Sequence, residues 1–256
     1  MKALPILRRW LVFIAFLLVW QWITASVAHP YFPTPLRIAE AAGHAWFADG
    51  AFTADVLPSL GRLLLGWLIA VAVGVPIGLA LGRSPVLTDY VSATFFFFRS
   101  VPATLLVPAF LVIFGIGPRA ELATILWGTL WPILLNTIDG ARSLDEVKIE
   151  TSRAFRIRGP RWVFGVVLPA AAPKVFAGMR LALSIAIILM VVSELMGSTS
   201  GIGFRMTDAL GSSLLPETWA WIVLVSLLGY ALNTLLSYVE RRALAWHPGF
   251  RADRLD

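Results

Sequence analysis

Long apolar segments separated by short polar ones make up most of this sequence. A helix that crosses the hydrocarbon core of a bilayer needs about 20 apolar residues, because that core is about 30 Å thick. The segments that approach this length run approximately from Trp10 to Val27, Leu60 to Gly82, Thr88 to Gly117, Ala120 to Ile138, Val175 to Gly197 and Trp219 to Val239. The pattern predicts an all-α polytopic membrane protein with six transmembrane helices. The composition agrees, since 58% of the residues are hydrophobic and 14% are charged, against about 25% charged in soluble domains.

The first apolar segment follows Lys2, Arg8 and Arg9, as the core of a secretory signal would. It is too long for a signal core, and the small residues after it form a weak cleavage site. We therefore expect a retained anchor helix over residues 10–27.

Lysine and arginine gather on one side of the predicted membrane. If the N-terminus is cytoplasmic, the inside segments hold 15 of the 21 basic residues and the outside segments hold 3. Cytoplasmic loops carry an excess of basic residues, so both termini are predicted to be cytoplasmic. The net charge of +6 then reports topology and needs no nucleic acid to explain it.

The third apolar segment contains Pro102 and Pro108. Each proline removes a backbone donor and clashes with the preceding helical turn. We expect a break near Ser100 to Pro102. Broken helices in a membrane are tolerated where they line an enclosed or watery path.

The second apolar segment carries four glycines at spacings of 8, 4 and 4 residues: Gly66, Gly74, Gly78 and Gly82. Such spacing places the glycines on one helix face, where another helix can approach closely. The alternative is that membrane helices are simply rich in glycine.

Arg99 and Glu194 lie inside predicted spans, where a charge is costly enough to suggest a function. At about 1.5 Å per residue, Arg99 lies near the midplane. It either faces the path, where a cation suits an anionic solute, or caps carbonyls freed by the helix break. Glu194 lies near the outer boundary, at a depth similar to Arg62, and pairing or snorkelling of these two outranks solute contact. The candidate path residues are Arg99, Ser100, Pro102 and Glu194.

The sequence lacks the usual arrangements for catalysis. No lysine is followed by serine or threonine, so no GxxxxGK[ST] phosphate loop exists. His29, His44 and His247 do not have the spacing of zinc ligands, and cysteine is absent. We expect neither an enzyme nor a cofactor or metal in this chain.

A basic, polar segment, ETSRAFRIRGPRWVFGVVLP at residues 150–169, separates the fourth and fifth spans. Residues 144–157 can form an amphipathic helix, with Ser143 as N-cap and Glu146 completing a capping box. A Gly-Pro pair then ends the helix, and a second helix follows. A basic loop that touches anionic lipid headgroups is the simpler alternative, but such a loop does not need this capped build.

This segment resembles the EAA loop in the permease subunits of binding-protein-dependent ABC importers. The usual form is EAA, three residues, a glycine, and LP about ten residues later. Here Glu150 stands for the first residue, Leu168-Pro169 give the end, and Arg156 replaces the glycine. The runs SLGRLLLGWLIAVAVGVPIGLALGRSPVL, FFRSVPATLLVPAFLVIFGIG and GMRLALSIAIILMVVSELMGSTSGIGFRM are similar to the nitrate, sulfonate and taurine branch.

The resemblance implies the type I ABC importer permease fold in the bacterial cytoplasmic (inner) membrane. Two copies would pair as a homodimer with two ABC ATPase subunits, which bind ATP and Mg, and with an external solute-binding protein. A cytoplasmic coupling helix would dock on the ATPase, through Glu150, Thr151, Arg153, Ala154, Phe155, Arg156, Arg158 and Gly159. With Arg156 in place of glycine, we expect the turn at Gly159-Pro160 and a helix about one turn longer than usual.

We therefore expect one transmembrane permease domain over residues 1–256. Its parts are the anchor helix 10–27, an external amphipathic loop 28–58, a core 59–240, the cytoplasmic coupling loop 139–174 and a cytoplasmic tail 240–256. The expected cargo is a small anion such as an aliphatic sulfonate, taurine or a nitrate-like solute. The alternative is a secondary transporter or channel that uses Arg99 and Glu194 as a charge relay, which needs no ATPase and leaves the coupling loop unexplained.

Overall fold

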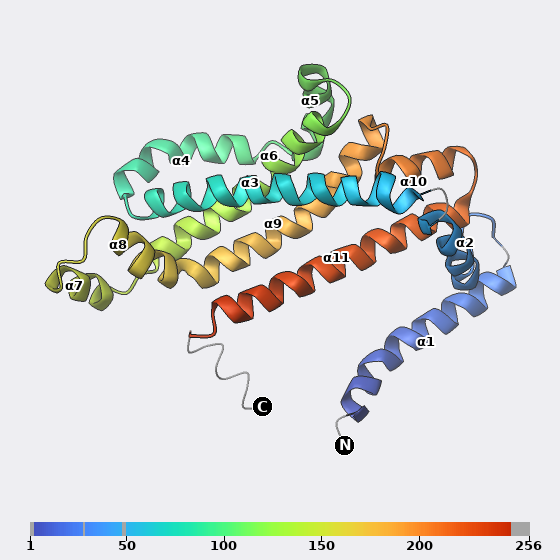
Figure 1. Ribbon diagram of the computed structural model, residues 1–256, viewed down its shortest axis with the longest axis horizontal. Coiled ribbons are helices and arrows are strands. Elements are labelled where there is room, and N and C mark those ends of the chain that lie inside the picture. The colour runs from blue at the N-terminus through green and yellow to red at the C-terminus, as the bar shows by residue number, and fades with distance from the viewer. Residues whose placement is uncertain (1–2, 28, 48–49, 247–256) are drawn as a thin grey trace. The chain divides into compact units, whose positions relative to one another are not determined.

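The computed structural model describes residues 3–27, 29–47 and 50–246, and within these ranges the chain forms helices and no strands (Figure 1). Lys2, His247, Arg251, Arg254 and most of the predicted tail lie outside the described residues. The α-helices are α1 Ala3–Val27, α2 Pro35–Phe47, α3 Leu57–Gly82, α4 Pro85–Arg99, α5 Val107–Phe114, α6 Pro118–Arg142, α7 Glu146–Ala154, α8 Pro160–Trp162, α9 Leu168–Gly197, α10 Ile202–Gly211 and α11 Leu215–Ala243. The short helices are the π-helices η2 Phe52–Val56 and η4 Val163–Val167 and the 3-10 helix η3 Ala103–Leu106.

The chain divides into two compact units. The smaller unit comprises residues 1–58 and 200–227, and the larger comprises residues 59–199 and 228–256. The larger unit holds most of the predicted core and the segment between the fourth and fifth spans, so it contains the candidate sites.

The predicted count of six apolar spans is not reproduced. By length and composition, four helices of the described chain can cross a membrane, or five if the bent pair around η3 is one span. Helix α6, which the sequence predicts as the fourth span, is long enough to cross a membrane but not apolar enough. It carries Thr124, Thr129, Asn136 and Thr137 along its length. An enclosed helix does not need a lipid-facing surface, so its composition can be more polar.

The threonine hydroxyls of α6 are satisfied within the helix itself. The hydroxyls of Thr124, Thr129 and Thr137 donate to the carbonyls four residues earlier, at 2.9, 2.6 and 2.7 Å. All three threonines are buried. Because a buried polar group is costly only when it lacks a hydrogen bond, these residues are tolerated inside the bundle.

The backbones of α3 and α6 approach closely along the predicted glycine face. A Cβ atom built on Gly66, Gly74, Gly78 or Gly82 would lie 2.8, 3.1, 2.6 or 2.6 Å from a side-chain atom of α6. The α6 residues met are, in the same order, Ile125, Ile133, Thr137 and Ala141. The matched spacing on the two helices confirms the close-packing interpretation of the glycine pattern.

The other face of α6 lies against α9, and the two helices run side by side (Figure 1). A Cβ on Gly140 of α6 would lie 3.0 Å from the Cβ of Ala171, and one on Gly178 of α9 would lie 2.8 Å from the carbonyl oxygen of Pro132. Helices α3 and α9 are therefore both held at short range from α6.

The break in the third predicted span is confirmed. Helix α4 ends at Arg99, and the helical pair formed by η3 and α5 is bent from it by 73°. Pro102 is extended, with φ −61° and ψ 124°, and the amide of Leu105 donates to its carbonyl at 3.0 Å. The chain therefore leaves α4 and restarts as a 3-10 turn.

The smaller unit contains the predicted amphipathic helix as α2. Its buried residues Ile38 and Ala42 pack with Ala220 of α11, and Trp20 of α1 and Trp219 lie against this cluster. The two indole rings meet edge to face with centroids 5.6 Å apart. The apolar side of α2 thus packs on protein.

In the smaller unit, the carboxylate of Asp55 binds the start of α10. Asp55 is buried, accepts from the backbone amide of Gly201 at 2.9 Å, and accepts from Nε of Arg205 at 2.6 Å. The negative charge lies just before the first turn of α10, where the helix dipole favours it.

We expect Gly78→Leu to destabilise the larger unit. The new side chain has no space between α3 and α6, and overpacking a core costs about 1–3 kcal/mol. The midpoint of thermal unfolding of the detergent-solubilised protein should fall. Gly61→Ala is the matched control in the same helix, because a Cβ there meets nothing within 4 Å. A Gly78→Leu protein as stable as the wild type would contradict the close approach.

Candidate functional site

Helix α7 lies in the segment predicted to contact an ATPase, but it starts later than predicted. Its N-cap is Asp145, whose carboxylate accepts from the amide of Val147 at 3.1 Å. Ser143 instead ends α6, where its amide donates to the carbonyl of Asp139 at 3.1 Å. The predicted capping box at Ser143 is therefore wrong, because α6 continues to Arg142 and uses this serine itself.

The end of α7 also differs from the prediction. The helix ends at Ala154, and Arg156 adopts a left-handed conformation with φ 53°. The amides of Arg156 and Ile157 donate to the carbonyls of Arg153 and Ser152 at 3.0 and 2.9 Å. These two bonds make a Schellman motif, which commonly uses glycine at the left-handed position.

The expectation of a longer helix is therefore wrong. The chain turns at Arg156, the position where the usual EAA pattern has glycine, and it turns again at Gly159, which has φ 62°. A left-handed residue with a Cβ costs about 1–2 kcal/mol, and the two helix-terminal hydrogen bonds offset part of this cost. The loop thus makes this helix end with an arginine at the position where the usual pattern has glycine.

Helix α7 has an exposed face and a covered face. Val147 is 66% exposed and Phe155, at the C-cap, is 76% exposed. Glu150, Thr151 and Ala154 are exposed with them. Ile149 packs on the buried cluster around Leu144 and Val167, and Ser152 is buried. The exposed face therefore presents large apolar side chains beside polar ones.

The remaining predicted contact residues lie at the edge of α7 and in the turn after it. Arg153, Arg156 and Arg158 are exposed. Arg153, Arg158 and Gly159 also line a hollow that they share with Arg83 and Trp162. The predicted set is thus split between the outer face of α7 and the hollow behind it.

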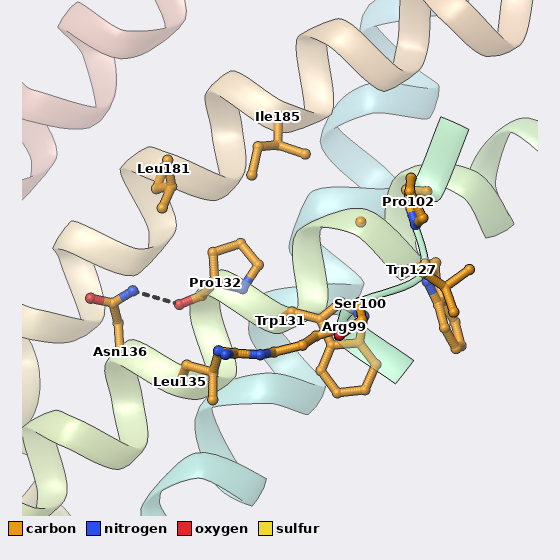
Figure 2. Close-up of a pocket in the computed structure, with 13 residues that line it drawn as sticks. Arg99, Ser100, Pro102, Trp127, Trp131, Pro132, Leu135, Asn136, Leu181 and Ile185 are labelled. Carbon is orange, nitrogen blue, oxygen red and sulfur yellow. Dashed lines mark hydrogen bonds between the residues drawn. The ribbon is translucent and has the colours of Figure 1, made fainter. Parts of the chain in front are cut away.

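A cavity of about 540 Å³, the break cavity, lies where the third span is interrupted. Arg99, Ser100 and Pro102 of the predicted path all line it (Figure 2). The other lining residues come from the connection between α4 and η3 and from η3, α6 and α9: Val101, Ala103, Trp127, Gly128, Trp131, Pro132, Leu135, Asn136, Leu181 and Ile185. Figure 2 shows the Arg99 side chain extended past Trp131 toward Leu135.

Arg99 is the charged residue among those that line the break cavity. Its guanidinium lies 4.6 Å from the centroid of the Phe96 ring, and no carboxylate of the described chain forms an ion pair with it. The Ser100 hydroxyl donates to the carbonyl of Phe96 at 2.6 Å. The side chain of Arg99 therefore supplies no hydrogen bond to the freed carbonyls of the break among the described contacts.

Two tryptophans and an asparagine on α6 complete the polar part of this wall. The indole nitrogens of Trp127 and Trp131 are buried and have no acceptor among the described residues. The Asn136 amide donates to the Pro132 carbonyl at 2.8 Å (Figure 2). Sequence inspection missed both tryptophans; their spacing of four residues on one helix face was the available signal.

Glu194 does not line the break cavity. It is buried near the end of α9, where Ser59 donates to it at 2.6 Å and Arg62 lies 3.1 Å away. Arg62 also forms an ion pair with Glu121 at 2.7 Å and lies 3.5 Å from the Ser198 hydroxyl. The predicted pairing of Arg62 with Glu194 is confirmed, and one arginine here bridges two buried carboxylates.

The second carboxylate of this buried cluster was missed. Glu121 lies in the first turn of α6, next to the predicted boundary of the fourth span, and was not counted among intramembrane charges. Its position one residue inside the predicted span, near the same outer boundary as Arg62, was the signal.

The sequence matches one known family over most of this structure. Residues 74–244 match the family described as the binding-protein-dependent transport system inner membrane component. The chain belongs to this family, and the resemblance to ABC importer permeases is confirmed. Its similar relatives are transport permeases and not enzymes.

Curated relatives cover nearly the whole chain. It is 30% identical over 234 residues to an aliphatic sulfonates transport permease protein of Bacillus subtilis, an alignment covering 91% of this chain and 84% of the relative. It is 27% identical to the taurine transport system permease protein of Escherichia coli, covering 89% and 85%. It is 26% identical to a nitrate import permease protein of Synechocystis, covering 88% and 84%.

Among solved structures, the chain resembles the MetNI methionine ABC transporter in inward-facing conformations. The TM-score is 0.63 at 21% identity, covering 74% of this chain and 94% of that one. This similarity shows the fold, which is that of a type I ABC importer permease.

We expect Arg62→Met to destabilise the larger unit strongly. It leaves Glu121 and Glu194 buried without their cation, and breaking a buried ion pair costs about 3–5 kcal/mol. The triple variant that also carries Glu121→Gln and Glu194→Gln should regain most of the loss, since no uncompensated charge remains. Thermal unfolding in detergent measures both.

Arg119→Met provides the control, because Arg119 is exposed two residues before Glu121. This change should leave the unfolding midpoint near the wild-type value. If Arg62→Met behaved like Arg119→Met, the cluster would contribute nothing to the junction of α3, α6 and α9.

Proposed function

We propose that this chain is the permease subunit of an ATP-driven importer for a small anionic solute. Two copies would form the membrane path, two ATPase subunits would bind ATP and Mg in the cytoplasm, and a solute-binding protein would deliver the solute from outside. The observation that carries this proposal is the exposed apolar face of α7, with Val147 and Phe155 more than half exposed. Large exposed apolar residues on a capped helix are typical of a docking surface.

The charge distribution supports placing α7 and both termini in the cytoplasm. Seven of the 15 basic residues assigned to the inside lie from Arg142, at the end of α6, to Lys174, near the start of α9, and basic loops stay on the cytoplasmic side. The membrane in question is then the bacterial cytoplasmic membrane. In this orientation the break cavity lies within the bilayer and α7 lies outside it.

A continuous helical segment runs from the turn after α7 to the break cavity. From Pro160 to Gly197 the chain is helical through α8, η4 and α9. Leu181 and Ile185 of α9 line the break cavity. A displacement of α7 by a closing ATPase would be transmitted through this rigid element, as interfaces with two packing arrangements transmit other domain movements.

The lining of the break cavity and the names of the relatives favour an anionic solute. Curated relatives of this chain are named for aliphatic sulfonates, taurine, nitrate and bicarbonate, and each of these carries an anionic group. Arg99 provides a cation that has no ion-pair partner among the described residues, and Pro102, Leu181 and Ile185 provide an apolar wall. We infer a solute with one oxyanion group and a small apolar part, which favours an organic sulfonate over a bare inorganic anion.

A secondary transporter with an Arg99–Glu194 relay is less well supported. Glu194 is buried against Arg62 and Ser59 and does not line the break cavity with Arg99. The two charges proposed for the relay therefore lie in separate environments.

We expect Phe155→Asp to abolish transport. The change places a charge on the exposed apolar side chain at the C-cap of α7, and truncating or charging an apolar anchor of an interface commonly costs about 2 kcal/mol or more of binding free energy. ATPase subunits should be lost when the tagged permease is purified, while membrane insertion persists. Glu150→Lys should act in the same direction.

Glu40→Lys is the control for Glu150→Lys, since it makes the same charge change at an exposed position of α2. It should retain the ATPase subunits. If Phe155→Asp and Glu150→Lys both kept full transport, the coupling role of α7 would be refuted.

We expect Arg99→Gln to lower uptake of the anionic solute by about 10-fold to 100-fold, because a hydrogen bond to a charged group contributes about 1.5–3 kcal/mol. The ATPase subunits should remain bound. Arg99→Lys keeps the charge and should lose less. The measurement is uptake into vesicles that contain the assembled importer and binding protein. A variant with reduced thermal stability but normal uptake per folded complex would assign Arg99 a structural role instead.

A further inference from the structure

A second hollow, of about 290 Å³, lies behind α7 and is rich in arginine. We call it the basic hollow. Its charged lining residues are Arg83, from the turn after α3, and Arg153 and Arg158, from α7 and the turn after it. The ring of Trp162 forms part of the wall. None of the described lining residues is a carboxylate.

The three guanidinium groups lack a counter-charge within the described chain. None of Arg83, Arg153 and Arg158 takes part in an ion pair there. Like charges gathered around one space repel each other, and the repulsion is relieved when an anion occupies the space. The electrostatics of the basic hollow therefore favour an anionic ligand.

Arg83 is held in position by the protein. Its Nη1 donates to the carbonyl of Ala141 at 3.2 Å, and its guanidinium carbon lies 5.1 Å from the centroid of the Trp162 ring. Its Nε is buried and meets no acceptor in the part of the chain that the structure describes. The side chain is thus preorganised by packing, which lowers the entropy cost of binding a ligand.

The position of the basic hollow along the spans identifies the ligand. Arg83 directly follows Gly82, where the apolar helix α3 ends, and Trp162 lies at the start of the helical segment Pro160–Gly197, which is long and apolar enough to span a membrane. Tryptophan and arginine at the ends of spans lie at the level of the lipid headgroups. Phe164, two residues after Trp162, is 68% exposed and suits an acyl chain.

We propose that the basic hollow binds the phosphate of an anionic phospholipid headgroup. The phosphate diester accepts hydrogen bonds from Arg83, Arg153 and Arg158, and the acyl chains lie along the apolar surface beginning at Phe164. Basic pockets between helices at the cytoplasmic membrane surface bind such headgroups. Because Arg153 lies in α7 and Arg158 in the turn after it, the bound lipid holds this helix in place.

This inference does not depend on an ATPase partner or on the identity of the solute. The exposed residues Val147 and Phe155 carry the proposed docking and do not line the basic hollow, whereas Arg83 and Trp162 line it and belong to elements other than α7. Lipid binding and importer function can therefore fail separately.

The test uses native mass spectrometry of the whole chain, released from vesicles of phosphatidylcholine mixed with phosphatidylglycerol. The double variant Arg83→Gln, Arg158→Gln should retain less phosphatidylglycerol, by about fivefold for each arginine removed. Arg161→Gln is the matched control, because Arg161 is an exposed arginine in the same loop that does not line the basic hollow. The control should retain lipid as the wild type does.

Three results would overturn the proposal. Equal loss of lipid in Arg161→Gln and in the double variant would mean diffuse attraction of charge. Thermal stabilisation of lipid-free wild type by inorganic phosphate, absent in the double variant, together with unchanged lipid retention, would assign the site to free phosphate. Unchanged lipid retention with loss of the ATPase subunits would assign the three arginines to an acidic partner surface.

Discussion

The close approach of α3 to α6 is the constraint on which the larger unit depends. Four residues of α3 have no side chain, so side-chain atoms of α6 can lie directly against its backbone: Gly66, Gly74, Gly78 and Gly82. Helix α6 is therefore covered by α3 on one side and by α9 on another. The features with functional potential are then distributed along α6. Glu121 joins the buried ion cluster in its first turn, Trp127, Trp131 and Asn136 line the break cavity, and the Ala141 carbonyl holds Arg83 at the basic hollow. One enclosed helix thus positions three separate sites.

Much of this arrangement follows from local sequence rules. Pro102 predicts the break in the third span, because a missing donor and a fixed φ act within a few residues, and the glycine spacing predicts a close-packing face. The polarity of α6 was harder to interpret. Its threonine hydroxyls donate to carbonyls of the same helix. The segment can therefore be buried among other helices, although its mean hydropathy is lower than that of the other spans. The outcome depends on which helices surround α6, and that is a tertiary property.

The candidate sites were less predictable, since they combine residues from distant segments. Sequence reasoning placed Arg99 at the break and paired Arg62 with Glu194, but it overlooked Glu121, which reaches Arg62 only once α3 and α6 are packed. It also predicted that α7 would end in a turn at Gly159, because glycine is the residue that usually adopts the left-handed conformation. The structure places an arginine there instead, and two backbone hydrogen bonds offset the cost. Residue type was a poor guide to backbone geometry at this position.

The π-helical turn η4, Val163–Val167, has a further consequence for the segment Pro160–Gly197. A π-turn winds about one residue more than an α-turn, which rotates everything before it by about 100° relative to an uninterrupted α-helix. Trp162 therefore does not lie in phase with the faces of α9, and a helical wheel drawn through the whole segment would assign it to the wrong side. The π-turn thus divides one helical segment into two parts whose side chains point in different directions around the axis. Side chains of α9 line the break cavity. On α8, before the turn, Trp162 points toward Arg83.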